Sequence, residues 1–153
     1  MPALRRAPGA RSLSAVFDRP FQGCGVRIRT RARSALQKKA KRGFRGYPIA
    51  TVAFYGPTGE LATKVVVAIV RGEGQEPAEL KSWSSEEADI RQDAGVQADI
   101  VAFIAEQGVL SVVMTDGLLG CPHEEGIDYP EGASCPTCPY WAGRDRFTKQ
   151  QLH

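Results

Sequence analysis

Four potential metal ligands stand close together in the last third of the chain, and they constrain its fold more than any other feature. Cys121 and His123 form one short block, and Cys135 and Cys138 follow in a Cys-x-x-Cys turn in which each cysteine precedes a proline. Two or three thiolates with imidazole suit a tetrahedral zinc ion. The surrounding segment is rich in Gly, Pro and acidic residues and can bury little of itself. We therefore predict a structural Zn²⁺ knuckle that stabilises it.

A disulfide and a redox-active Cys-x-x-Cys are the alternatives to a metal site. The chain begins without the pattern of a secretory signal peptide, so we expect a cytoplasmic protein, and a reducing compartment disfavours a structural disulfide. A redox motif normally starts a helix after a strand, whereas Cys135 follows a polar loop. Cys24 lies far from the other cysteines in sequence and is predicted to be a bystander.

Charge divides the chain into two parts. Residues 1–46 hold 13 of the 20 Lys and Arg residues and a single acid, Asp18, whereas residues 47–153 carry a net charge of −9. Self-repulsion and low apolar content predict that residues 1–46 are a basic, disordered extension, with at most one marginal helix over 31–42. It would be an arm that neutralises phosphates, a transit peptide, or an extension that the working protein does not need, and we favour the last.

Residues 47–117 have the sequence pattern of a small α/β core. Two β-rich runs, 49–55 and 61–70, flank a Gly-Pro-Thr-Gly turn and predict a β-hairpin. The second run is apolar on both faces, which is typical of a central strand. Residues 71–83 are predicted to be a polar connection.

A helix and a third strand complete the predicted core. Ser84 and Glu87 have the spacing of a capping box, although Gly95 argues against one uninterrupted helix and Asp93 would cap a fresh start. Gly108 would end the helix, and a strand follows over 109–115. A right-handed crossover would then place this strand parallel to the second strand, giving a small mixed sheet in the order 1-2-3.

One helix covers one face of such a sheet only. The other face would be covered by the zinc module, predicted to span residues 118–148 and to pack on the core, by residues before 47, or by a second subunit. We favour a homodimer.

An enzymatic role is the less favoured interpretation. His123-Glu124-Glu125 followed by Cys135-x-x-Cys138 resembles the zinc site of nucleobase deaminases, in which Glu125 would shuttle protons. The nine residues between Glu125 and Cys135 leave no room for the rest of that fold, and Cys121 would occupy the position that a catalytic water needs. No catalytic residue is assigned; in a zinc-dependent hydrolase or deaminase, Glu125, Glu124 and Asp116 would be the candidates. Asp116 follows the third strand, where ligands of α/β sheets bind, or it belongs to an ordinary Asp-Gly turn.

A binding module is the favoured interpretation. Aromatic residues alternate with arginines after the Cys-x-x-Cys turn: Tyr140, Trp141, Arg144, Arg146 and Phe147. Such a set suits binding of single-stranded RNA or DNA. A protein partner agrees better with the net negative charge of residues 47–153. If the residues bind no partner, they would pack on the knuckle and pair with one another. No apolar run approaches 18 residues, so we expect no membrane span.

Several blocks of the chain resemble a family of small, uncharacterised bacterial proteins. They are Tyr47 to Thr51 with Gly56-Pro57, Ser111 to Asp116, Gly120 to Pro130, and Cys135 to Trp141 with Arg144-Asp145-Arg146. The resemblance covers residues 43–148. It implies a bacterial, cytoplasmic protein and the same zinc ligands, but no activity. The order of hairpin, helix and strand is also similar to ribonuclease H-like sheets, without their acidic catalytic residues.

Overall fold

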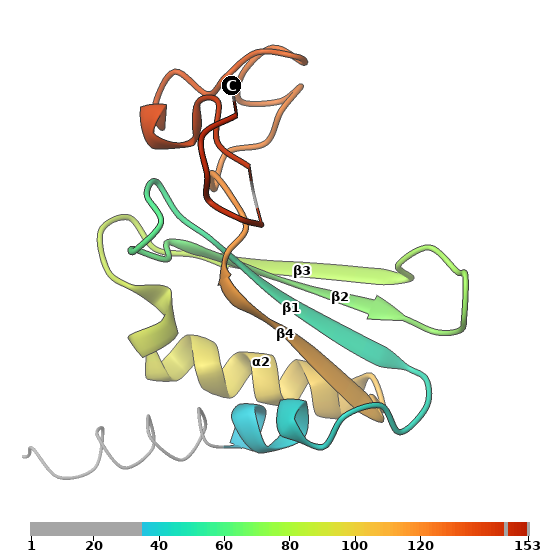
Figure 1. Ribbon diagram of the computed structural model, residues 1–153. Coiled ribbons are helices and arrows are strands. Elements are labelled where there is room, and N and C mark those ends of the chain that lie inside the picture. Colours follow the sequence, from blue (N-terminus) through green and yellow to red (C-terminus); the bar gives the residue numbers. More distant parts are fainter. Residues whose placement is uncertain (1–34, 146, 153) are drawn as a thin grey trace, which may run out of the picture.

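A four-stranded mixed sheet forms the centre of the protein (Figure 1). The computed structural model describes residues 35–145 and 147–152. The strands are β1 (Ile49–Tyr55), β2 (Lys64–Val70), β3 (Glu79–Ser84) and β4 (Ser111–Leu118), in the order β3-β2-β1-β4. β1 and β3 pair antiparallel with β2, and β4 pairs parallel with β1.

The predicted hairpin is confirmed, but the predicted order of the sheet is wrong. The segment expected to be a polar connection contains β3, which takes the free edge of β2. The strand that returns after the helix therefore pairs with the free edge of β1 and not with β2. β3 was missed because it is an edge strand with the sequence ELKSWS, five of whose six residues are exposed. Such a strand is held by backbone pairing and needs no apolar pattern.

The core lies on one face of the sheet, where alternate residues of the strands are buried. Ala50, Val52 and Phe54 of β1 and Val65, Val67 and Ile69 of β2 contribute to it. Helix α2 (Ala94–Glu106) covers this face with Ile100, Phe103 and Ile104. The period of two in the strands and of about 3.6 in the helix place these side chains in one apolar layer.

Helix α2 has the predicted caps. The Asp93 carboxylate accepts a hydrogen bond from the Val96 N–H at 3.0 Å, and Gly108, at φ 64°, follows the C-cap residue Gln107. The predicted capping box does not start a helix, because Ser84 ends β3. A short 3₁₀ turn, η1 (Ile90–Gln92), precedes α2 instead.

A second helix, over residues 35–41, packs on the same side of the sheet as α2 (Figure 1). Leu36 is 1% exposed and Ala40 packs against the core, so the folded body begins before residue 47, where the sequence suggested a boundary. Ser111 ties the following segment to β4: its hydroxyl accepts from the Arg45 N–H and donates to the Gly46 carbonyl. The rest of the basic extension, with Cys24, lies outside the described residues.

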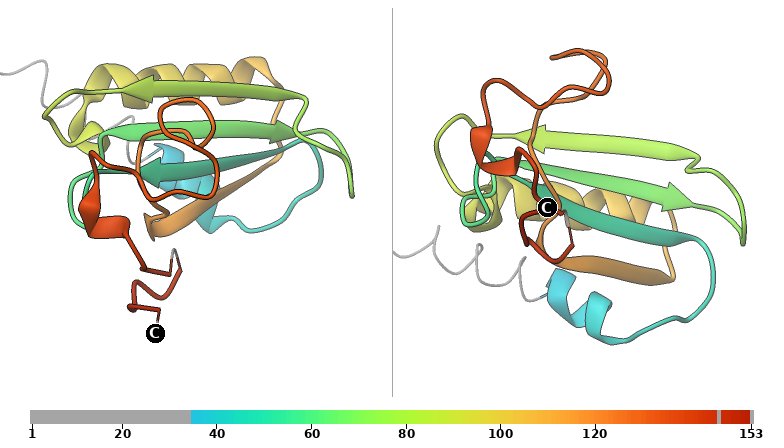
Figure 2. Two further views of the ribbon diagram at one scale, coloured as in Figure 1. Left: turned by 90° about the horizontal axis from the view of Figure 1, so that it is seen from above. Right: turned by 45° about the horizontal axis from the view of Figure 1, so that its top comes forward.

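Among the described residues, the opposite face of the sheet is covered at one end only. Residues 119–152, the C-terminal segment, lie over the end of β1 and the start of β2 (Figures 1 and 2). Further along that face Leu80 is 66% and Val113 56% exposed. The C-terminal module was one of the segments expected to cover this face. The homodimer, in which a second subunit would cover it, stays a prediction.

Candidate metal centre

The chain enters the C-terminal segment directly from the edge strand of the sheet. After Leu118 the backbone still follows β1, because the Leu119 N–H donates to the Phe54 carbonyl at 2.8 Å and the Gly56 N–H donates to the Gly120 carbonyl at 2.9 Å. Cys121 therefore begins its loop from a fixed position. This pairing holds one half of the candidate site on the sheet.

The other half is held at the same corner by a tryptophan. Cys138 is followed by a 3₁₀ turn, η2 (Pro139–Trp141), in which the Trp141 N–H donates to the Cys138 carbonyl. The indole Nε1–H of Trp141 donates to the Gly56 carbonyl at 2.7 Å. Gly56 thus binds the strand that leads to Cys121 through its N–H and the turn that follows Cys138 through its carbonyl.

The structure brings all four predicted ligands together. One ligand atom from each of Cys121, His123, Cys135 and Cys138 lies within 4.8 Å of the other three. His123 Nδ1 lies 3.1 Å from Cys121 Sγ, 3.4 Å from Cys138 Sγ and 3.5 Å from Cys135 Sγ. In a tetrahedral zinc site with Zn–S of about 2.3 Å and Zn–N of about 2.0 Å, a nitrogen lies about 3.5 Å from each sulfur. The four residues, called the ligand cluster below, therefore have the spacing of a metal site.

The thiols of the ligand cluster do not favour ionisation together. Burial, with smaller effects of Cys121 and Cys135, raises the pKa of Cys138 to about 12, and burial also raises the pKa of Cys121. Burial acts in the same sense on Cys135, but hydrogen bonds from the Cys121 thiol and from the N–H groups of Thr137 and Cys138 outweigh it and lower that pKa. Three thiolates in such a space need a positive charge among them, which a divalent cation supplies.

The acidic residues beside the ligand cluster are occupied in local structure. Glu124 pairs with Lys64 at 2.7 Å, and the Glu125 carboxylate accepts from the Gly132 N–H. The Asp128 carboxylate accepts from the Glu124 N–H at 2.7 Å. Within the described residues, no carboxylate joins the set of atoms that could hold the ion. The three acids shape the loop between Cys121 and Cys135.

Asp116 does not lie at the metal centre. It is exposed within β4, not in a turn after the strand, and lines a different cavity together with Thr115 and Gly117. Lys64 is the residue at the centre that the sequence did not reveal. Its ammonium group donates to the Pro122 carbonyl and to Glu124, and a lysine at the start of a strand carries no signal of such a role.

Two of the aromatic residues after Cys138, Tyr140 and Trp141, each have a cation over the ring. The Arg144 guanidinium lies 4.5 Å from the ring centre of Tyr140, and the Lys149 ammonium lies 4.8 Å from that of Trp141. The Arg144 guanidinium also donates to the Lys149 carbonyl. Trp141 packs partly against the core of the sheet. These residues bind one another and fix the segment to the sheet; Arg146 lies outside the described residues.

No helix among residues 35–145 and 147–152 is long and apolar enough to cross a membrane. Comparison with protein-family models, with curated proteins and with solved structures finds no match for the chain.

Proposed function

We propose that the protein binds one zinc ion through Cys121, His123, Cys135 and Cys138, and that this structural site shapes the C-terminal segment for contact with a partner protein. The observation that carries the proposal is the position of His123 Nδ1, 3.1 to 3.5 Å from all three sulfurs. Three thiolates and one imidazole match the preference of zinc and leave no open position in a tetrahedron.

The ion's part would be to fold the loop, as in other small zinc modules. The segment from 119 to 145 contains no helix beyond the short η2 turn and no strand, and only Cys135 and Cys138 of its residues are buried, apart from Gly120. Binding of a structural zinc contributes on the order of 10 kcal/mol to such segments. None of the three cysteines of the ligand cluster is in a disulfide, so all three sulfurs are available to an ion.

A protein partner is favoured over RNA or DNA by charge and by exposure. Residues 47–153 carry a net charge of −9, which repels phosphates. The rings of Tyr140 and Trp141 already carry Arg144 and Lys149. Three large apolar side chains of the segment are exposed: Ile127 at 77%, Phe147 at 80% and Leu152 at 64%.

Zinc content together with X-ray absorption on protein purified without chelator tests the site. We expect one zinc per chain with three sulfur ligands, one nitrogen and no oxygen. Replacing Cys135 and Cys138 by Ser should abolish zinc binding and lower the melting temperature, whereas Cys24→Ser should change neither. Full stability and zinc content in the double variant would refute the proposal.

One observation supports a second candidate, a zinc-dependent hydrolase or deaminase. A cavity of about 300 Å³ lies against Cys121 and His123 and is also lined by Glu124 and Glu125. An oxygen among the zinc ligands in the absorption experiment would favour this candidate, because a catalytic ion keeps a position for water. Glu125→Gln and Glu124→Gln would then be the first variants to assay.

A further inference from the structure

A second cavity lies away from the ligand cluster, between β4, the start of α2 and the helix over residues 35–41. Its volume is about 650 Å³, and none of the four ligands lines it. Pockets for small molecules in proteins commonly have volumes of about 300–1,000 Å³. The cavity extends to the carboxyl end of β4, which pairs parallel with β1, and ligands of sheets with parallel strands bind at such ends.

An amide side chain from the buried side of α2 faces this cavity. Gln97 is 4% exposed, lies on the buried side of α2 with Ile100 and Ile104, and lines the cavity. Its backbone N–H donates to the Asp93 carbonyl, but no described residue hydrogen-bonds its side chain. Among the described residues, no buried side-chain nitrogen or oxygen lacks a partner, so the Gln97 amide reaches the open space of the cavity. A ligand in the cavity would find a hydrogen-bond donor in this amide.

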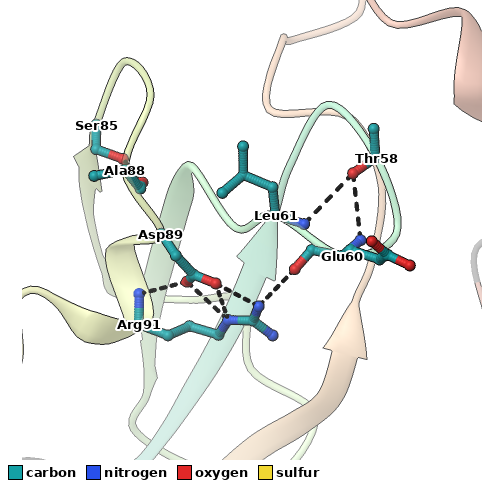
Figure 3. Close-up of polar contacts among 7 residues, drawn as sticks. All are labelled: Thr58, Glu60, Leu61, Ser85, Ala88, Asp89 and Arg91. Carbon is teal, nitrogen blue, oxygen red and sulfur yellow. Dashed lines mark hydrogen bonds and ion pairs between the residues drawn. The ribbon is translucent and has the colours of Figure 1, made fainter.

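A cation is fixed beside the same helix start. Nε and Nη2 of Arg91 donate to the Asp89 carboxylate, and Nη2 also donates to the Glu60 carbonyl at 2.6 Å (Figure 3). The side chain is thereby held in one orientation. Figure 3 draws no bond from the third nitrogen, Nη1, and no described residue accepts from it. Arg91 thus lines the cavity with a donor to spare.

The remaining walls define the kind of molecule that would fit. Leu36, Ala40, Phe54 and Met114 give apolar surface. The charged lining residues are Lys41, Arg91 and Asp116, and Arg91 is also paired with Asp89 outside the lining. We propose that this cavity is a binding site for a small organic anion with an apolar or aromatic body, whose acidic group takes hydrogen bonds from Gln97 and Arg91.

The aromatic sulfonate 1-anilinonaphthalene-8-sulfonate is a suitable probe, because its fluorescence rises in apolar sites. Titrated into the full-length, zinc-loaded protein, it should bind at one saturable site. Its uncharged analogue N-phenyl-1-naphthylamine has the same rings without the sulfonate and should bind about tenfold more weakly, as expected for the loss of one charge-assisted hydrogen bond.

Two variants place the probe in the cavity. Gln97→Leu keeps the side-chain size and removes the amide, and should weaken sulfonate binding about tenfold with no change for the neutral analogue. Gly117→Trp should block both compounds. Gly117 lines the cavity, a Cβ added there meets nothing within 4 Å, and so the fold should tolerate it.

Gln75→Leu and Ser82→Trp are the matched controls, since both residues are exposed and neither lines the cavity. They should bind the sulfonate like the original protein, and circular dichroism should show all four variants folded. Sulfonate binding that folded Gly117→Trp leaves intact would overturn the proposal, as would equal affinity for the neutral analogue.

Discussion

At the scale of single residues, Gly56 connects the sheet to both halves of the candidate metal centre. Its N–H binds the Gly120 carbonyl and its carbonyl binds the indole of Trp141. A side chain at this position has no room, because a Cβ would overlap the backbone carbonyl of Leu61. Gly59, three residues later, has a Cβ position whose three nearest neighbours are all atoms of the Tyr140 side chain.

Gly56→Ala should therefore destabilise the protein by about 2–3 kcal/mol, as overpacking against fixed backbone does. Gly59→Ala should cost less than about 1 kcal/mol, because the Tyr140 ring can turn away. Urea denaturation of both variants gives the comparison. Similar losses in the two would mean that the corner around Gly56 is more pliable than the structure shows.

The residue scale also separates what the sequence could reveal of the site from what it could not. Ligand identity follows from the chemistry of sulfur and imidazole at short spacing, so Cys121, His123, Cys135 and Cys138 were predicted. The pairing of Glu124 with Lys64 crosses 60 positions in sequence, and the bond from Trp141 to Gly56 crosses 85. Contacts between residues so far apart in sequence depend on the whole fold, and no local sequence pattern predicts them.

At the scale of secondary structure, helix α2 illustrates how far local signals reach. Asp93 was predicted as its cap, and the Asp93 carboxylate accepts from the Val96 N–H. Asp93→Ala should lower the free energy of unfolding by about 1 kcal/mol. Asp99→Ala is the control, because Asp99 is exposed in the same helix and caps nothing. Thermal or urea unfolding measures both, and equal effects would contradict the capping role.

A second prediction at this scale concerns the turn after the metal centre. Hydrogen bonds from the N–H and hydroxyl of Thr148 and from the N–H of Phe147 hold the pKa of Asp145 below its ordinary value of 3.8. Because the folded pKa is the lower one, the ionised carboxylate stabilises the turn above the ordinary pKa, and this effect is lost as pH falls through the folded pKa.

In an NMR titration, the Asp145 carboxyl should protonate below pH 3.8, and the Thr148 amide resonance should follow it. Asp145→Ala should remove that step and speed amide exchange at Thr148. An Asp145 that titrates at its ordinary pKa would show that the turn does not persist in solution.

The strand pattern was a weaker guide than the helix caps. β1 and β2 carry alternating buried residues and were predicted, since one face of each meets the core. β3 carries no such pattern, and missing it was enough to misplace β4 in the sheet. Sheet order depends on which edges are free, and one unrecognised edge strand changes that.

At the scale of the whole molecule, the protein has a core that does not include the ligand cluster. Within the described part of the chain, the cluster of buried apolar residues runs from Leu36 to Leu118, and Trp141 is the one residue of the C-terminal segment that packs against it. Sheet and helices should therefore keep their structure when the metal is removed, while residues 119–145 lose theirs.

Hydrogen exchange with and without chelator checks this division. Chelation should raise exchange in the 119–145 loop and leave the amides of β1, β2 and α2 protected; readdition of zinc should reverse the change. If the strands lost protection as well, the metal would be needed for the fold of the entire chain.

The placement of the two tryptophans gives the protein a built-in optical assay. Trp83 packs edge-on against Phe103 under the sheet, whereas Trp141 joins the C-terminal segment to Gly56. These are the only indoles in the chain, so Trp83→Phe leaves an emission spectrum that reports on the C-terminal segment and Trp141→Phe leaves one that reports on the core. Metal loading and global unfolding can then be followed as separate signals in an unlabelled sample.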